Sequence, residues 1–448
     1  MMTIVPNNPR HAEASPFCID SGAPAPDIAL AERLFNELRD RTDEGRPDRG
    51  VTRVSYGLGE QIAHDMVQRE ARRLGLSCRI DAACNLYLTL KGRTAGPGIV
   101  IGSHLDSVPK GGNFDGAAGV LAGLAVAAGF VRAGQRPARD LTIMAIRAEE
   151  SAWFGASYIG SRAAFGKLSE TELDTVVRSS DRVLLRAAIA SAGGNPDLLK
   201  TGHAHLRPAD VAAFIEPHIE QGPVLIGEGR ALGIVTAIRG SFRYRYARCE
   251  GQYAHSGATP RSLRRDAVLA TAHLAVTLDA VWQRHSEAGH DLSVTFGQLV
   301  TDRENAAFSK VAGLVDFSLD VRSEEPATLD LMRTELARAV AAIEAEFGVR
   351  FHLGEETGSD PARMADGLIH QVSDIAGQLG LDARKMPCGA GHDAAIFAQH
   401  GVPTAMIFIR NRNGSHNPHE AMEIADFARA ADVLSTLCDM WPEPPVTP

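Results

Sequence analysis

Apolar and polar residues follow one another along the first half of the chain in blocks that predict alternating strands and helices. The run Ile99-Val100-Ile101 is too short for a stable helix and is β-branched, so it predicts a buried strand. Apolar residues at helical spacing surround it, at residues 60–74 and 117–133. Further strands are predicted at residues 78–80, 86–90, 140–146 and 214–222, with a helical insertion at 155–210. This alternation favours an α/β fold with a mixed sheet flanked by helices.

The pattern changes after Gly222. Alternating polar and apolar residues at 233–250 predict a strand, and a helix (262–285), two strands (292–300 and 314–322) and a second helix (326–347) follow. This order is typical of a smaller α+β domain inserted into the first. From residue 350 the chain returns to the alternating strands and helices of the α/β pattern. The predicted divisions are a mobile tail at 1–26, the larger domain at 27–225 and 341–448, and the inserted domain at 226–340.

Length and charge narrow the classes of function. A chain of 448 residues is too long for one ordinary core, which agrees with two domains. The net charge of -9 argues against nucleic acid or an anionic membrane as a partner. No apolar stretch reaches the roughly 18 to 20 residues that span a bilayer, and the first residues lack the pattern of a secretory signal. The scattered cysteines, without a C-x-x-C pair, indicate reduced thiols, so we expect a cytoplasmic protein.

Candidate metal ligands follow the strand at 99–101. His104 and Asp106 are two residues apart and therefore share one face of that strand, and a glycine-rich loop then presents Asp115. Sites in open α/β sheets collect outside the carboxyl ends of the strands. Imidazole and carboxylate suit a divalent metal, and a second carboxylate commonly orients a ligand histidine. His104 alone is better explained as a core histidine, but the three groups together favour a metal site.

A pair of carboxylates, Glu149 and Glu150, ends the next predicted strand. Adjacent carboxylates repel each other unless a cation lies between them or one is protonated, and most such pairs are solvated turns. Here the strand is expected beside His104. We therefore predict that one glutamate completes the metal site and that the other is the general base for a metal-bound water.

Two more histidines lie near strand ends, His218 within the strand at 214–222 and His416 in the loop after the strand at 404–409. Gln221 is a neutral donor and acceptor suited to a substrate amide or carboxyl group. Two metals that share one bridging carboxylate, with a hydroxide between them, would use a ligand set of this kind. Spacing alone leaves the grouping open because the residues are distant in sequence. The candidate ligands are His104, Asp115, Glu150, His218 and His416.

Several segments, in this order, resemble the dinuclear-metal amidohydrolases related to aminoacylases and zinc carboxypeptidases. The resemblance is strongest to the N-carbamoyl-L-amino-acid hydrolase, allantoate amidohydrolase and β-ureidopropionase branch, whose third ligand lies in H-I-E-Q-G. It spans roughly residues 50 to 440, and the combination is more specific than any single motif. The segments are SHLDSVPKGGNFDG, AEE, EPHIEQGPVL, YAHSGATP, DVR, GAGHDA and GSHNPHE.

The resemblance implies roles at the metal site. The five candidate ligands match those of two divalent ions per subunit, with Asp115 as the bridge. Glu149 matches the general base, which deprotonates the bridging water and later protonates the leaving nitrogen. Asp106 matches the carboxylate that supports His104. Zinc is the first expectation for the metal, and nitrogen and oxygen ligands suit manganese, cobalt or nickel as well.

The resemblance also implies how substrate is bound. His255, in the inserted domain, resembles a histidine that stabilises the oxyanion in a neighbouring subunit's site, which implies a homodimer and a lid and dimerisation role for that domain. Gln221 and Arg322 match substrate contacts, and a guanidinium suits a bidentate grip on an α-carboxylate. From the residues alone, His255 is better explained as an ordinary polar turn residue, and Arg322 as a salt-bridge partner within its strand.

One loop departs from the family pattern. Members that bind N-carbamoyl amino acids usually carry an asparagine in an N-x-V-P-G-like loop ahead of the D-x-R strand. Here the loop reads ENAAFSKVAG, so the candidate Asn305 is displaced and Ser309 or Lys310 lies nearby. This departure bears on substrate identity and leaves the expected metal chemistry unchanged. His392 is a further candidate substrate contact, and its neighbour Asp393 is equally suited to cap a helix.

We therefore predict a metallo-amidohydrolase that cleaves a linear C–N amide or ureido bond of a small carboxylate substrate, most simply an N-carbamoyl amino acid or ureido acid. N-acyl amino acid deacylation and dipeptide cleavage are alternatives that use the same metal site. A catalytically silent binding protein on the same fold is the alternative of another class, and the intact Glu149 and ligand set argue against it.

Overall fold

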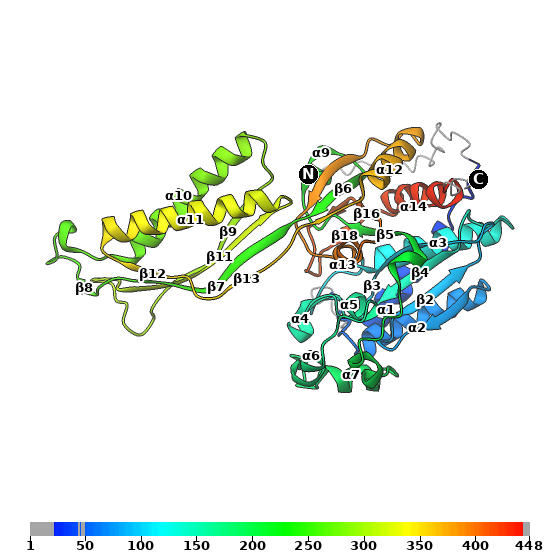
Figure 1. The fold of residues 1–448 in the computed structure, drawn as a ribbon, viewed down its shortest axis with the longest axis horizontal. Coiled ribbons are helices and arrows are strands. Elements are labelled where there is room, and N and C mark those ends of the chain that lie inside the picture. The colour runs from blue at the N-terminus through cyan, green and yellow to red at the C-terminus, as the bar shows by residue number, and fades with distance from the viewer. Residues whose placement is uncertain (1–21, 44, 46–49, 442–448) are drawn as a thin grey trace, which may run out of the picture.

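The computed structural model describes residues 22–43, 45 and 50–441, and these residues form two main sheets with separate cores (Figure 1). Most of the predicted N-terminal tail, at 1–21, lies outside the described residues. In the part of the chain that the structure describes, every helix is too short or too polar to cross a membrane.

The larger sheet has nine strands and is mixed. Its centre is parallel: β4 (Leu141–Ile146), β3 (Gly98–His104), β5 (Val211–Ile219) and β16 (Thr404–Ile409) are neighbours in that order. The carboxyl ends of these strands therefore meet at one edge. On the two sides lie the antiparallel strands β1 (Ser77–Ile80), β2 (Leu86–Leu90), β6 (Leu232–Ile238) and β14 (Ala362–Arg363), and β15 (Arg384–Cys388) pairs with β6.

Helices cover both faces of the larger sheet. On one face α3 (Ala117–Arg132) lies so close that a Cβ at Gly119 would stand 2.2 Å from the Pro217 carbonyl oxygen. On the other face Phe214 stacks on Phe397 of α13 (Asp393–Gln399), with ring centroids 3.6 Å apart. Further helices around this core are α1 (Ile28–Thr42), α2 (Leu58–Arg73), the short α9 (Val224–Glu228), α12 (Asp366–Gln378) and α14 (Ile424–Asp439). The central strands are buried on both sides, as the run Ile99-Val100-Ile101 predicted.

Short helices occupy the predicted insertion between β4 and β5. They have an apolar cluster of their own, which includes Trp153, Ile159, Ile189 and Leu199. The helices are α4 (Ser151–Phe154), α5 (Ile159–Ala164), α6 (Glu170–Thr175), α7 (Leu185–Ser191) and α8 (Pro196–Lys200).

The smaller domain is a five-stranded antiparallel sheet with two long helices. Its strands are β12 (Arg350–His352), β7 (Gly240–Glu250), β11 (Leu314–Ser323) and β9 (Ser293–Thr301), and β13 (Glu356–Ser359) also pairs with β7. Helices α10 (Ala267–Glu287) and α11 (Pro326–Phe347) pack on it. At its far end, β8 (Ala254–His255) and β10 (Lys310–Val311) form a short ribbon (Figure 1). The predicted α/β domain with an inserted α+β domain is confirmed.

The predicted division at 226–340 is wrong at both ends. β6 belongs to the larger sheet, whereas β12 and β13 belong to the smaller one, so the inserted domain runs from Gly240 to Ser359. The alternating pattern that begins at Gly233 covers two strands in different sheets, and nothing in that pattern marks the crossing. The two crossings lie side by side, because a Cβ at Gly240 would stand 2.5 Å from Pro361.

Candidate metal centre

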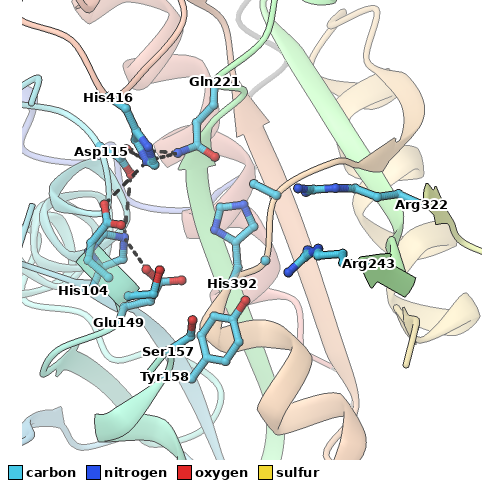
Figure 2. Close-up of a pocket in the computed structure, with 14 residues that line it drawn as sticks. His104, Asp115, Glu149, Ser157, Tyr158, Gln221, Arg243, Arg322, His392 and His416 are labelled. Carbon is cyan, nitrogen blue, oxygen red and sulfur yellow. Dashed lines mark hydrogen bonds and ion pairs between the residues drawn. The ribbon is translucent and has the colours of Figure 1, made fainter. Parts of the chain in front are cut away.

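A pocket of about 270 Å³ opens at the carboxyl ends of the parallel strands. β3 ends in His104, Glu149 and Glu150 follow β4, and β5 carries His218 near its end. The C-terminal loop after β16 adds His416. Figure 2 shows that the side chains of His104, Glu149 and His416 converge although they come from distant parts of the chain.

Two groups of possible metal ligands share one carboxylate. Asp115 Oδ1 lies 3.1 Å from His218 Nε2 and 3.7 Å from His104 Nε2. Asp115 Oδ2 lies 3.3 Å from His416 Nε2, which is 3.6 Å from Glu150 Oε1. Within each group the donor atoms lie within 4.8 Å of one another. Each oxygen of Asp115 thus faces one group, which is the arrangement expected of a bridging ligand.

The second ring nitrogen of each inner histidine faces a fixed acceptor. His218 Nδ1 lies 2.8 Å from the Ile219 carbonyl, and His104 Nδ1 lies 3.3 Å from Asp106 Oδ1. Asp106 in turn accepts hydrogen bonds from the backbone N–H groups of Glu149 and Glu150, both at 3.2 Å. This carboxylate therefore orients His104 and holds the loop that presents the two glutamates.

The charges in the pocket favour a cation. Burial raises the pKa of Glu149 well above its usual range, and burial together with Asp115 raises the pKa of Glu150 to about 7. The hydrogen bond to Asp115 raises the pKa of His416 to about 9. Among the described residues, the ion pairs of these carboxylates involve only histidines. Buried imidazole nitrogens and carboxylate oxygens around one shared aspartate fit two divalent ions.

The loop that carries Glu149 is anchored by a buried ion pair beneath it. Glu60 accepts hydrogen bonds from Arg147 Nη1 at 2.8 Å and from the backbone N–H of Ala148 at 2.9 Å. Ala148 has a φ of 51°, which is costly for a residue with a Cβ. Glu60 and Arg147 are both buried.

We predict that Glu60→Ala destabilises the protein by about 3–5 kcal/mol, since it leaves Arg147 charged and unpaired in the core. The control is Glu37→Ala, because Glu37 forms a surface pair with Arg69 at 2.7 Å; its loss is expected to cost at most about 1 kcal/mol. Urea unfolding followed by circular dichroism measures both. Equal effects of the two substitutions would contradict the prediction.

Three of the predicted substrate contacts line the pocket, and two do not. Gln221, Arg322 and His392 face the cavity. His255 and Asn305 lie at the far end of the smaller domain, where His255 belongs to the ribbon and is exposed, and Asn305 donates a hydrogen bond to Asp302. Within one chain, neither residue is among those that line the pocket.

The structure also shows details that the sequence did not indicate. Arg243 and Tyr158 line the pocket, although no motif marks either residue. Asp393 does not cap α13; it is the first residue of the helix and accepts a hydrogen bond from Ser161 Oγ. The carboxylate that reaches the start of α13 is Glu216, which accepts from Ala394 N at 2.7 Å.

Known proteins resemble this chain along most of its length. The profile of Peptidase family M20/M25/M40 matches residues 100–439. The chain is 33% identical to an N-carbamoyl-L-amino-acid amidohydrolase of Paenarthrobacter aurescens over 91% of this chain and 97% of the relative. It is 32% identical to the allantoate amidohydrolase of Escherichia coli over 87% of this chain and 93% of the relative. A solved amidase of the hydantoinase/carbamoylase family from Burkholderia multivorans superposes with a TM-score of 0.83 at 28% identity, covering 93% of this chain and 98% of that one.

The predicted resemblance is thereby confirmed. Two features carry it: the profile match covers most of the chain, and the relatives align along nearly their whole length. The chain belongs to Peptidase family M20/M25/M40, and within that family to the amidohydrolases of the hydantoinase/carbamoylase group.

Proposed function

We propose that the protein hydrolyses the linear ureido bond of an N-carbamoyl amino acid or a related ureido acid, with two divalent ions in the pocket. The observation that carries the proposal is Asp115, whose two oxygens each face a separate group of ligand atoms, beside the carboxylate of Glu149, which belongs to neither group. The names of the relatives support the substrate class.

The residues that would hold the ions form two sets. His104 and His218 belong to the first, Glu150 and His416 belong to the second, and Asp115 belongs to both. When bound, such ions act as Lewis acids that polarise a carbonyl group and lower the pKa of water.

Glu149 is suited to move the proton. It belongs to neither set, yet its Oε2 lies 3.9 Å from His104 Nε2 and faces the same cavity. A carboxylate held beside the ligand groups without belonging to either is suited to accept a proton from the attacking water. The protonated acid can then deliver that proton to the leaving nitrogen.

Two neutral side chains are placed to bind the polar part of the substrate. Gln221 Nε2 donates to Asp115 Oδ2 at 3.0 Å, which leaves its buried Oε1 without a hydrogen-bond partner. Both ring nitrogens of His392 are also buried without a partner, and the ring packs 4.3 Å from that of His218. Buried polar atoms in this state are suited to the N–H and C=O groups of a ureido substrate.

A panel of N-carbamoyl, N-acyl and ureido substrates tests the proposal, with metal-stripped protein reloaded with zinc, manganese or cobalt. Release of ammonia from a carbamoyl or ureido compound is expected. Activity on N-acyl or peptide substrates alone would contradict the proposed substrate class, but it would still agree with the proposed metal site.

We further propose a homodimer in which the smaller domain of each chain presents His255 to the pocket of its partner. His255 is exposed at the end of the molecule farthest from the larger domain (Figure 1). Its Nδ1 accepts from the backbone N–H groups of Gly257 and Ala258, both at 3.2 Å, so its Nε2 can carry the proton needed to donate to an oxyanion.

Mixed dimers test this arrangement. His255→Ala and Glu149→Gln are each expected to be nearly inactive as homodimers, because every pocket then lacks one group. Mixing the two chains is expected to restore about a quarter of the wild-type activity, since about half of the dimers are mixed and each has one complete pocket. Absence of any recovery, with subunit exchange shown by mass spectrometry, would refute the shared site.

A further inference from the structure

Two arginines of the smaller domain form one wall of the pocket, opposite the possible metal ligands. Arg243 lies on β7 and Arg322 lies on β11, and Figure 2 shows both side chains reaching toward His392. In the antiparallel register Arg243 stands directly across from Asp320, and Arg322 is two residues further along on the same face. One aspartate therefore lies between two guanidinium groups.

The two guanidinium groups differ in what they already bind. Arg322 donates from Nε and Nη2 to Asp320, at 3.1 and 2.7 Å, and from Nη1 to the Gly389 carbonyl at 2.6 Å. Arg243 only approaches Asp320, with Nε 3.4 Å from Oδ1. Among the described residues the Arg243 guanidinium donates no hydrogen bond, and its Nε is buried without a hydrogen-bond partner.

This difference decides which arginine has donors to offer. A guanidinium has five N–H donors, and a carboxylate is best bound by two parallel ones. The donors of Arg322 are largely directed at Asp320 and Gly389, whereas the two Nη groups of Arg243 donate no hydrogen bond to any described residue and only its Nε faces Asp320. Asp320 neutralises one of the two positive charges, so the wall keeps a net positive charge for an anion.

We propose that Arg243 is a specificity-determining residue that binds the carboxylate of the substrate, with Arg322 acting beside it and held in place by Asp320. The inference rests on the proposed function in so far as the bound acid is a substrate. The proposed function does not include Arg243, because no motif marks this residue. With Arg243 included, the preference of the pocket for carboxylate substrates depends on strand β7 as well as on β11.

The test compares an N-carbamoyl amino acid with its neutral carboxamide. Binding is measured by calorimetry on protein that carries Glu149→Gln, so that the ligand survives, and turnover is measured on the otherwise wild-type chain. Arg243→Met is expected to raise the Kd and KM of the acid by about 10- to 100-fold. The Kd and KM of the carboxamide are expected to change by no more than about threefold. Arg243→Lys, which keeps the charge and loses the fork, is expected to recover part of the loss.

The matched control is Arg248→Met. Arg248 lies on the same strand and pairs with Asp316 across the same two strands, at 2.7 Å, but it does not line the pocket. Arg248→Met is expected to leave the Kd and KM of both the acid and the carboxamide unchanged. The inference would be overturned if Arg243→Met weakened binding of the acid and of the carboxamide equally, or if it left the Kd of the acid unchanged. It would also be overturned if protein with Arg243 intact did not bind the acid. A wild-type protein that binds the acid but hydrolyses no ureido compound would instead overturn the proposed function.

Discussion

Replacing Glu149 with glutamine is expected to lower kcat by about 10²- to 10⁴-fold, the range that a positioned acid or base contributes. Glutamine keeps the shape of the side chain but cannot accept the proton of the attacking water. Because Glu149 belongs to neither ligand group, the metal content is expected to stay at the wild-type value. Ammonia release gives kcat, and mass spectrometry of dissolved metal gives the stoichiometry.

The neighbouring carboxylate supplies the control for this experiment. Glu150 has nearly the same burial as Glu149 but faces His416 as a possible ligand, so Glu150→Gln is expected to lower both kcat and metal content. The two variants therefore separate proton transfer from metal binding. A near-normal kcat in Glu149→Gln would remove Glu149 from the role of base.

Replacing Asp115 with alanine is expected to abolish activity together with the binding of both ions, since both ligand groups use this side chain. His416→Ala removes a ligand from one group only, so about one ion per chain is expected to remain. The second readout is thermal stability. A ligand at 100 times its Kd stabilises a protein by about 2.7 kcal/mol, so added zinc is expected to raise the Tm of the wild type and not that of Asp115→Ala. Two ions bound to Asp115→Ala would refute the shared carboxylate.

The sequence predicted the fold where local pattern and tertiary structure agree. The β-branched run at Ile99 and the small residues of α3 indicate a buried strand and a helix packed closely on it, and both are present. The boundary of the inserted domain was missed because β6 and β7 are separated by a single residue, Arg239, and both are strands. Which sheet a strand joins depends on partners far away in the sequence.

The residues of the candidate site could likewise be predicted only in part. The residues at strand ends, such as His104 and His218, were found because chain topology brings the carboxyl ends of parallel strands together. Arg243 was not found, because its significance depends on a cross-strand register and on what the neighbouring Arg322 already binds. The position of His255 could be inferred only from the family, since the residue lies far from the pocket of its own chain.

The two adjacent crossings between the domains, beside Gly240 and Pro361, have a consequence for substrate length. The arginine wall belongs to the smaller domain and the carboxylates of the opposite wall belong to the larger one. A substrate that contacts both walls therefore spans two domains that the chain connects only at these two crossings. The separation of the walls, and with it the length of acid that fits, depends on the angle at which the crossings set one domain against the other. Residues at the crossings can thus affect which acids fit without touching any of them.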